Sequence, residues 1–342
     1  MRGLLAYDDR ILRHHALRDL LTYDLIDYIT MQIYHSLSEL PDFQNTVITI
    51  GSFDGVHNGH KKILSQVKSL ADEVKGESVV VTFHPHPRFV LKGKNDDLKL
   101  ITTITEKADL LEKYGVQHLV IVPFSDEFSQ QSPDEYLNDF LVKYFKPAYI
   151  VIGYDHRFGK NRIGDISFLK KFEKEQHYKV VEIAKQTIED IGISSTKIRK
   201  ALDNKEILNA NQLLGHHFVL HGKVVKGKKV GRTIGFPTAN IEISDKDKLI
   251  PPFGIYAVWA FLGEKKYGGM LYIGNRPTLK DDEKVSIEVN LFEFDDDIYE
   301  QYLWIEFVDF IRNDKKFDGL EALQMALGRD RIRAQYLLNP PQ

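Results

Sequence analysis

The stretch Gly51-Ser-Phe-Asp-Gly-Val-His-Asn-Gly-His60 joins an apolar run to an amphipathic segment, and it decides the fold of the first half of the chain. The preceding Thr46-Val-Ile-Thr-Ile50 is typical of a buried strand, whereas the residues from Lys61 onward place an apolar stripe on one helical face. The loop therefore opens onto a helix N-terminus, where backbone N–H groups and the helix dipole attract anions. These features predict a phosphate site in which His57 and His60 add side-chain donors.

This loop follows neither of two common phosphate-binding patterns. No Gly-Lys-Ser/Thr follows it, as in a Walker A loop, and it lacks the G-x-G-x-x-G order of dinucleotide sites. Its H-x-G-H ending resembles the signature of adenylyl and cytidylyl transferases, in which both histidines contact the nucleotide phosphates. The competing interpretation is that His57 and His60 only cap a helix or pack on a turn.

Composition limits the kinds of partner that we expect. The 342 residues predict two domains, and a net charge of -3 gives no reason to expect a nucleic-acid or membrane partner. The chain has no cysteine, which excludes disulfides and thiolate metal sites and is compatible with a reducing cytoplasm. No apolar run approaches the ~18 residues of a membrane span. We therefore expect a cytoplasmic protein.

The first 30 residues do not resemble the rest of the chain. They lack a secretory pattern, and their five aspartates argue against a transit peptide. Our hypothesis is that Met31 is the native start and that residues 1–30 are an added extension; the alternative is an extra amphipathic helix. The predicted division is an extension at 1–30, a first domain at 31–200, a linker helix at 201–215 and a second domain at 216–342.

The first half alternates short apolar runs with segments of helical period. The runs after residue 50 lie at 79–83, 119–122, 149–152 and 180–183. This alternation predicts a doubly wound α/β domain with a parallel sheet, in which ligands bind beyond the C-terminal ends of the strands. Polar motifs occur there: His84-Pro-His-Pro87 and Gly153-Tyr-Asp-His-Arg-Phe-Gly159 each follow a run.

The second half changes to a period of two. Strands are predicted at 219–225, 255–261, 267–273, 285–294 and 303–310, which suggests a small antiparallel barrel. A closing helix is predicted at 318–337. Its residues expected to face the barrel are Leu320, Leu323, Ala326, Leu327 and Ile332.

Other residues of the first half could add to the phosphate site. The hydroxyls of Ser195 and Thr196 and the guanidinium of Arg199 are groups that bind phosphates at a helix start. A plain N-cap formed by residues 194–196 is an equal alternative. His84 and His86 alternate with prolines and are expected to line a pocket wall, and a metal site there would need a third ligand.

In the second half, Gly231-Arg-Thr-Ile-Gly-Phe-Pro-Thr-Ala-Asn240 combines a glycine loop with two small polar side chains. In an extended chain Thr238 and Asn240 share one face, and their neutral oxygens suit a Mg²⁺ ion that ATP already partly neutralises. The alternative is a plain polar strand face. Glu288 lies on the polar face of the 285–291 run, where a solvated glutamate is the simpler interpretation.

Four motifs of the first half resemble the adenylyltransferase module of the bacterial bifunctional riboflavin kinase/FAD synthetase family. They are G-S-F-D-G-V-H-N-G-H, T-F-H-P-H-P, G-Y-D-H-R-F-G-K-N-R-I-G-D and I-S-S-T-K-I-R. The resemblance implies that His57 and His60 are catalytic. The ATP-binding residues that it implies are Gly51, Ser52, Phe53, Asp54, His57, Gly59, His60, Ser195, Thr196 and Arg199. It places Asp155, Arg157 and Phe158 near the flavin.

The second half is similar to the kinase barrel of the same family in G-R-T-I-G-F-P-T-A-N, I-G-N-R-P-T and I-E-V-N-L-F. The resemblance implies that Glu288 is the general base. Gly231, Gly235, Thr238 and Asn240 would bind ATP, with Thr238 and Asn240 holding the metal. Arg312 and Phe317 match positions near the isoalloxazine ring. After Asp297-Ile-Tyr299 the family usually has glycine, whereas this chain has Glu300, which puts the local turn in question.

The implied reactions are riboflavin + ATP to FMN + ADP in the barrel and FMN + ATP to FAD + pyrophosphate in the first domain, both with Mg²⁺. Riboflavin presents a neutral hydroxyl and benefits from a base, whereas the phosphate of FMN, with a second pKa of ~6, is already a nucleophile. Flavins are then substrates and products, with transient hand-over to apo-flavoproteins. The alternatives are a cytidylyltransferase for a phosphorylated alcohol and a non-enzymatic flavin sensor, which we would expect to have lost His57, His60 or Glu288.

Overall fold

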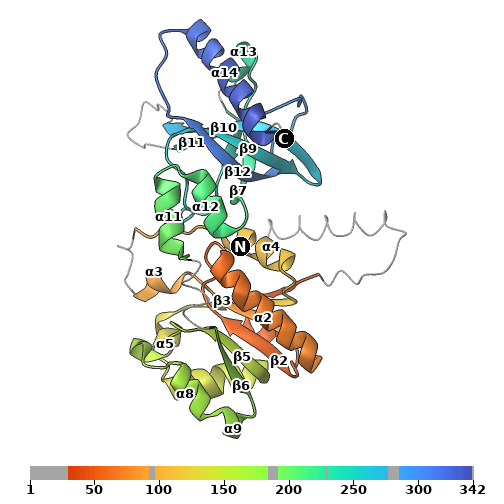
Figure 1. The fold of residues 1–342 in the computed structure, drawn as a ribbon, viewed down its shortest axis with the longest axis vertical. Coiled ribbons are helices and arrows are strands. Elements are labelled where there is room, and N and C mark those ends of the chain that lie inside the picture. Colours follow the sequence, from red (N-terminus) through yellow and green to blue (C-terminus); the bar gives the residue numbers. More distant parts are fainter. Residues whose placement is uncertain (1–29, 92–96, 184–191, 228–229, 276–284, 341–342) are drawn as a thin grey trace, which may run out of the picture.

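The computed structural model describes residues 30–91, 97–183, 192–227, 230–275 and 285–340. The predicted extension therefore lies outside the described residues except for Thr30. Figure 1 shows two lobes, an α/β lobe below and a barrel above, with α4 (Ile104–Lys113), α11 (Ser195–Asp203) and α12 (Ile207–Leu214) between them. No helix among the described residues is both long and apolar enough to cross a membrane.

The lower lobe contains a parallel sheet of strand order β1-β4-β3-β2-β5-β6. Its strands are β1 (Gln32–Tyr34), β2 (Thr46–Ile50), β3 (Ser78–His84), β4 (His118–Pro123), β5 (Pro147–Gly153) and β6 (Lys179–Ile183). The doubly wound prediction is confirmed, and β1 is an edge strand that was too short to be recognised. The strand order reverses between β2 and β5, so the loop after β2 opens at the switch point where such sheets bind ligands.

Helices cover both faces of this sheet. Val47 and Val80 pack with α2 (Asn58–Val74) and α4, whereas Ile48 and Val79 pack with the π-helical segment Tyr136–Val142. Alternate residues of one strand thus enter two different cores, which is why the runs are mostly apolar on both faces. The shorter helices are α3 (Pro87–Leu91), α5 (Asp126–Ser129), α6 (Pro133–Glu135), α7 (Lys143–Phe145), α8 (Ile166–Lys171) and α9 (Glu173–Gln176), with 3-10 turns at Leu37–Glu39 and Lys160–Arg162.

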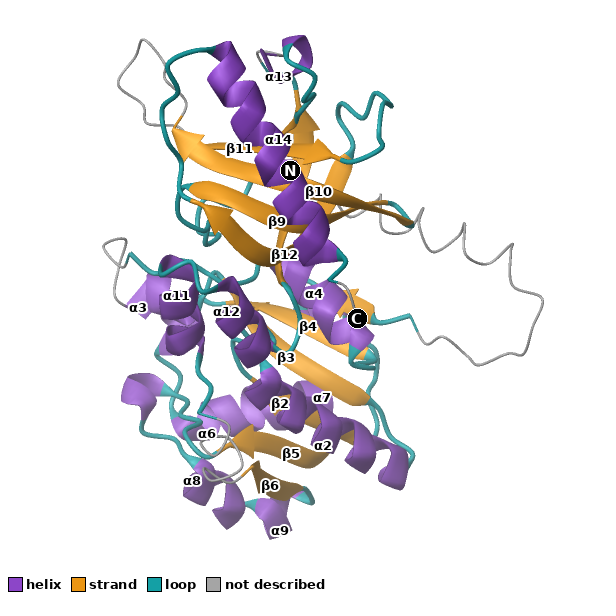
Figure 2. Ribbon diagram, turned by 45° about the horizontal axis from the view of Figure 1, so that its top comes forward, coloured by secondary structure: helices purple, strands orange, loops and turns teal. Residues whose placement is uncertain are grey.

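The upper lobe is a closed antiparallel barrel of order β10-β11-β8-β7-β12-β9. Its strands are β7 (Phe218–Val225), β8 (Ala239–Glu242), β9 (Gly254–Leu262), β10 (Lys265–Asn275), β11 (Val285–Leu291) and β12 (Tyr302–Arg312). The prediction of an antiparallel barrel is confirmed, but β8 is a sixth strand that was not among the predicted ones. A short helix, α13 (Val230–Thr233), precedes β8, and α14 (Leu320–Leu338) lies against the barrel wall (Figure 2).

The prediction for the face of α14 was partly wrong. Leu323 and Leu327 pack on the barrel and Ala326 is buried, but Leu320 is 60% exposed and Ile332 is 69% exposed. The buried stripe continues instead through Asp330, Ala334 and Leu338. Asp330 occupies this stripe because it binds Arg312 of β12, so a buried ion pair takes the position that a purely apolar pattern would assign to another residue.

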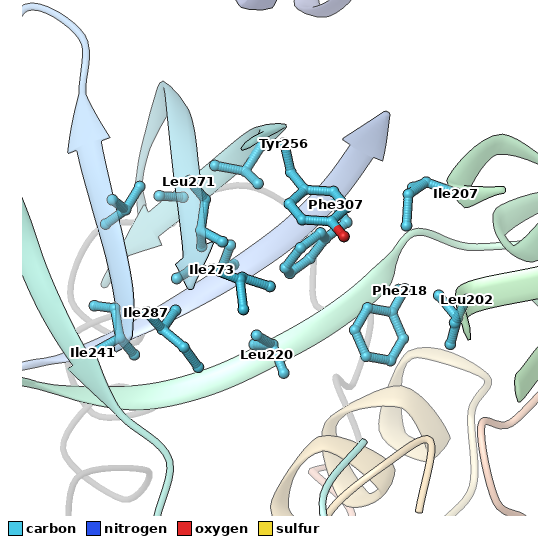
Figure 3. Close-up of a cluster of buried hydrophobic side chains, with 14 of the residues drawn as sticks. Leu202, Ile207, Phe218, Leu220, Ile241, Tyr256, Leu271, Ile273, Ile287 and Phe307 are labelled. Carbon is cyan, nitrogen blue, oxygen red and sulfur yellow. The ribbon is translucent and has the colours of Figure 1, made fainter. Parts of the chain in front are cut away.

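The hydrophobic core of the barrel continues into α11 and α12, and it also includes Ile101 and Ile193. Leu202 of α11 and Ile207 of α12 pack with Phe218, Tyr256 and Phe307 of the barrel, as Figure 3 shows. The segment predicted as a linker helix at 201–215 contains the end of α11, a turn and α12. Because these helices share their buried side chains with the barrel, they fix its position relative to the sheet.

Candidate active sites

The phosphate loop, residues 51–60, follows β2 and opens onto α2. His57 is the N-cap of α2, and its Nδ1 accepts a hydrogen bond from His60 N at 3.3 Å. The capping interpretation is therefore correct as far as Nδ1 is concerned. Because Nδ1 accepts, the proton of the neutral ring lies on Nε2, which stays available as a donor. Capping and phosphate binding thus use different nitrogens.

The two histidine rings stack with centroids 3.6 Å apart and planes at 11°. Burial lowers the pKa of His57 to about 4 and holds the pKa of His60 well below its usual 6.5. His60 Nδ1 is a buried nitrogen with no hydrogen-bond partner in the described protein. Both rings are therefore neutral at pH 7, each with one N–H donor, and a bound polyphosphate would raise both pKa values by adding negative charge.

A cavity of about 830 Å³ lies at the C-terminal ends of β2, β3 and β5. Its wall contains most of the residues of the first half that were predicted to bind the nucleotide or the flavin. Those in its wall are Gly51, Ser52, Phe53, His57, Gly59, His60, Asp155, Arg157, Phe158 and Ser195. Motifs that are separated by more than 140 positions in the chain therefore meet in one hollow.

Asp54, Thr196 and Arg199 are not in this wall. The Asp54 carboxylate is buried, accepts a hydrogen bond from Thr102 N at 3.0 Å and forms an ion pair with Arg199. Arg199 Nε also donates to Lys99 O at 2.7 Å, and Thr196 is exposed. In this structure the ion pair of Asp54 and Arg199 stabilises the phosphate loop and joins it to α11.

The start of α11 combines both interpretations of residues 194–196. Ser194 is the N-cap, because its hydroxyl accepts a hydrogen bond from Lys197 N at 3.3 Å. Ser195 reaches the cavity wall and donates to Asp54 O at 3.2 Å. The cap and the cavity hydroxyl are therefore neighbouring residues with different tasks.

The cavity also contains residues that the sequence argument did not assign. Arg88 and Arg162 lie in the wall; Arg88 directly follows the H-P-H-P motif, and Arg162 lies within the G-Y-D-H-R-F-G-K-N-R-I-G-D motif. His86 is in the wall as predicted, with its pKa lowered to about 4 mainly by burial. His156 Nε2 is buried without a partner, and burial and two arginines lower its pKa to about 4. The position of the two arginines in or next to the motifs could have identified them as candidate residues of the cavity wall.

A second group of predicted residues meets in the barrel. Thr238 Oγ1 donates to Glu288 Oε2 at 3.0 Å, and Ser286 Oγ donates to Glu288 Oε1 at 3.0 Å. Asn240 lies opposite Glu288 in the register of β8 and β11, and its side chain is buried. Glu288 is half-buried with both oxygens engaged, so the solvated-glutamate interpretation does not describe it.

The glycines of the predicted kinase loop shape the turn before β8. Gly235 has φ +79°, and a side chain on Gly231 would approach Phe236 O to 2.2 Å. Phe236 N donates to Gly231 O at 2.9 Å, which closes the turn. Only glycine allows both the positive φ and the close approach.

Arg312 and Phe317 lie together at the end of β12. The guanidinium of Arg312 forms a two-nitrogen ion pair with Asp330 of α14, and its carbon lies 5.5 Å from the centre of the Phe317 ring. Tyr272 OH donates to Asp314 Oδ2 at 3.1 Å, and burial with this carboxylate raises the pKa of Tyr272 to about 12. The two residues of the barrel half that were predicted to lie near the flavin, Arg312 and Phe317, thus form one cluster with α14.

Comparisons with known proteins assign the two halves of the chain to two families. Residues 40–197 match the FAD synthetase family and residues 214–338 match the riboflavin kinase family. A bifunctional riboflavin kinase/FMN adenylyltransferase of Listeria monocytogenes is 38% identical over 88% of this chain and 95% of its own. The chain belongs to this bifunctional family. A Bacillus subtilis member is 35% identical over 89% of this chain and 96% of its own, and an Escherichia coli member is 33% identical over 88% and 95%.

A solved structure shares the whole two-lobed fold. It is described as a macrolide-efflux protein from Streptococcus pneumoniae, with a TM-score of 0.80, 29% identity and coverage of 91% of this chain and all of the other. In the described part of the present chain, the parallel sheet belongs to the FAD synthetase half and the closed barrel to the riboflavin kinase half.

The turn at Glu300, where the resemblance led us to expect glycine, is intact. Glu300 takes the left-handed conformation, with φ +68°, that a glycine would adopt there. Its N–H donates to Val224 O at 2.9 Å, and its carboxylate pairs with Lys223. The chain therefore forms this turn with glutamate in the left-handed conformation.

Among the described residues no cluster of three or more histidines, aspartates or glutamates could hold a metal ion. The oxygens of Thr238 and Asn240, next to the carboxylate of Glu288, are hard ligands of the kind that magnesium prefers. Two neutral oxygens fit an ion that arrives with ATP, because the phosphates supply the remaining charge.

Proposed function

We propose that the two transfers use separate sites, riboflavin phosphorylation at Glu288 in the barrel and FMN adenylylation in the cavity of His57 and His60. The observation that carries this division is chemical: the barrel holds a carboxylate between two hydroxyl donors, and the cavity holds neutral imidazoles at a helix start. The substrates are riboflavin, FMN and ATP, and the final product is FAD.

In the barrel, Glu288 accepts the proton of the ribityl hydroxyl as its oxygen attacks the γ-phosphorus of ATP. A new P–O bond forms, the bond to the β-phosphate oxygen breaks and ADP leaves. The hydroxyls of Thr238 and Ser286 orient the carboxylate through their hydrogen bonds. Arg312 and Phe317 would lie beside the flavin ring.

In the cavity, a phosphate oxygen of FMN attacks the α-phosphorus of ATP and pyrophosphate leaves. No base is needed because the phosphate of FMN is already ionised. His57, His60 and the N–H groups at the start of α2 stabilise the charge that builds up on the α-phosphate oxygens. Asp155, Arg157 and Phe158 would contact the flavin, and Ser195 the phosphates.

Magnesium is proposed for both steps. Thr238 and Asn240 would hold it in the barrel, and the bound ion would neutralise charge on the transferred phosphates. The protein's own part is to align the hydroxyl, the carboxylate and the phosphates. We also propose a cytoplasmic location, where ATP is available, and transient hand-over of the product to apo-flavoproteins.

The test is one assay of the purified full chain. Riboflavin, ATP and magnesium are incubated with the protein, and FMN and FAD are separated by chromatography. We expect FMN first and FAD later, and ATP replaced by CTP should give no flavin dinucleotide. A dinucleotide formed only with CTP would instead support the cytidylyltransferase alternative.

A further inference from the structure

We propose that Lys248, a buried lysine of the barrel half, is a positioning residue for adenylyl transfer and acts on the phosphate loop through the segment 99–103. The inference rests on the assignment of FMN adenylylation to the cavity of His57 and His60. Lys248 lies between β8 and β9, outside residues 40–197 that match the FAD synthetase family. A residue of one lobe would thus support the reaction of the other.

The ammonium of Lys248 is fully used by the protein. Nζ donates to Ile101 O at 2.6 Å, to Glu106 Oε2 at 2.6 Å and to Val219 O at 2.7 Å. Three protons meet three acceptors, and the side chain has no exposed surface. Two of the acceptors belong to the α/β lobe and one to β7, so the ammonium ties the lobes together at one point.

Glu106, its partner, is equally enclosed. Its carboxylate also accepts hydrogen bonds from Thr103 N at 2.8 Å, which caps α4, and from His221 N of β7 at 2.9 Å. A buried ion pair of this kind contributes little net stability compared with apolar side chains of the same shape, but its partners must keep their geometry. We infer that it sets the position of α4 and the preceding segment against the barrel.

The segment 99–103 is also bonded directly to the barrel half. Leu100 N donates to Asp247 O at 2.7 Å, and Leu249 N donates to Leu100 O at 2.7 Å. The two bonds of Leu100 are made by Asp247 and Leu249, the residues directly before and after Lys248. Together with the bond from Lys248 to Ile101, they fix Leu100 and Ile101, two consecutive residues of the segment.

The next residue of the segment holds the phosphate loop. Thr102 N donates to Asp54 Oδ1 at 3.0 Å, and Thr102 Oγ1 accepts a hydrogen bond from Gly55 N at 3.0 Å. Thr102 is buried. The path from Lys248 to the loop is therefore Ile101 and then Thr102, two adjacent residues of one extended segment.

The phosphate loop needs such support because part of it is strained. Phe53 has φ +45° and Val56 has φ +39°, and a β-branched residue rarely adopts a positive φ. Conformations of this kind persist only where the surroundings impose them. Gly55 lies between these two residues, and His57 follows directly, so loss of the Thr102 bonds would let the loop relax and move the imidazole.

The main test uses Glu106→Gln together with Lys248→Met in the full chain, which leaves no unpaired buried charge. We expect kcat for FMN adenylylation to fall about 10- to 100-fold, the effect of a misplaced catalytic group, with a smaller change in KM for ATP. Riboflavin phosphorylation should be unchanged. A merely structural role would lower both activities together with the folded fraction.

A second pair of variants tests the path itself. Thr102→Val removes the acceptor for Gly55 N but keeps the N–H that binds Asp54, and it should lower adenylylation while sparing the kinase. Thr102→Ser keeps the hydroxyl and should retain the wild-type rate of adenylylation. The control is Asn211→Ala: Asn211 bonds Phe307 O and Phe218 N without touching the segment, so it should lower the thermal midpoint and leave both activities.

Two results would overturn the proposal. One is a folded double variant that adenylylates FMN at the wild-type rate; the other is an equal loss of both activities in the double variant. If the double variant does not fold, the Thr102 pair decides, and wild-type adenylylation by Thr102→Val rejects the proposal. Absence of FAD formation by the wild-type chain would reject the adenylyltransferase assignment instead, so the two failures are distinct.

Discussion

Thr238 Oγ1 donates a hydrogen bond to Glu288 Oε2 at 3.0 Å, across the pairing of β8 with β11. The bond joins the proposed magnesium-binding threonine directly to the proposed base. A hydroxyl that donates to one carboxylate oxygen fixes its orientation, so the carboxylate is already aligned when the substrate hydroxyl arrives. The two residues therefore form one functional unit, although 49 positions separate them in the chain.

Glu288→Gln should abolish FMN formation and spare the conversion of supplied FMN to FAD. Glutamine keeps the shape and an acceptor for Thr238 but cannot take a proton, so we expect kcat of the kinase to fall about 10²- to 10⁴-fold. The measurement is chromatography of FMN and FAD from each flavin substrate. Glu306→Gln, in β12 of the same barrel, is the matched control and should keep both activities.

His57→Ala should impair the conversion of FMN to FAD and spare the formation of FMN from riboflavin. Removal of a donor to the α-phosphate is expected to lower FMN adenylylation about 10²- to 10³-fold, with riboflavin phosphorylation retained. His118→Gln, at the start of β4 and far from the cavity wall, is the control. Loss of both activities in either His57→Ala or Glu288→Gln would falsify the division between the two sites.

Stability should fall as the pH falls from 6.5 toward 4. The pKa of His57 is about 4 in the folded chain and about 6.5 when exposed. Below pH 6.5 the unfolded chain gains a proton that the folded chain does not, so the free energy of unfolding decreases, by about 2 kcal/mol between pH 7 and pH 5 for this group at most. Urea unfolding at both pH values measures it. In His57→Ala this part of the pH dependence should disappear, and an unchanged slope would contradict the assignment.

Asp330→Ala should destabilise the barrel and impair riboflavin binding. It leaves the guanidinium of Arg312, which is partly buried, without its bidentate partner, so we expect a loss of about 2–4 kcal/mol in the free energy of unfolding. If Arg312 lies beside the flavin ring, KM for riboflavin rises while FMN adenylylation continues. Asp318→Ala, just before α14, is the control, and an unchanged KM for riboflavin would argue against a flavin site at Arg312.

Most of the fold could be predicted because both halves have regular patterns. Runs such as 79–83 are mostly apolar on both faces since parallel strands are buried on both faces, and the barrel strands alternate. The pattern failed at β1, which has three residues, and at Ile332 on α14. In the second case Asp330 takes the buried position through its ion pair with Arg312, a contact that no periodicity records.

By itself the sequence determined which chemistry the chain carries. Residue type and spacing indicated the phosphate loop and the Thr238 and Asn240 pair, because phosphate binding requires particular groups in a particular local geometry. The role of Glu288 followed only from the resemblance to the family. Only the tertiary structure showed that Asp54 and Arg199 pair with each other beneath the loop, and that Lys248 of the barrel reaches the α/β lobe. Such contacts join residues about 145 positions apart, and burial of charge in a shared core depends on the packed fold rather than on any local pattern.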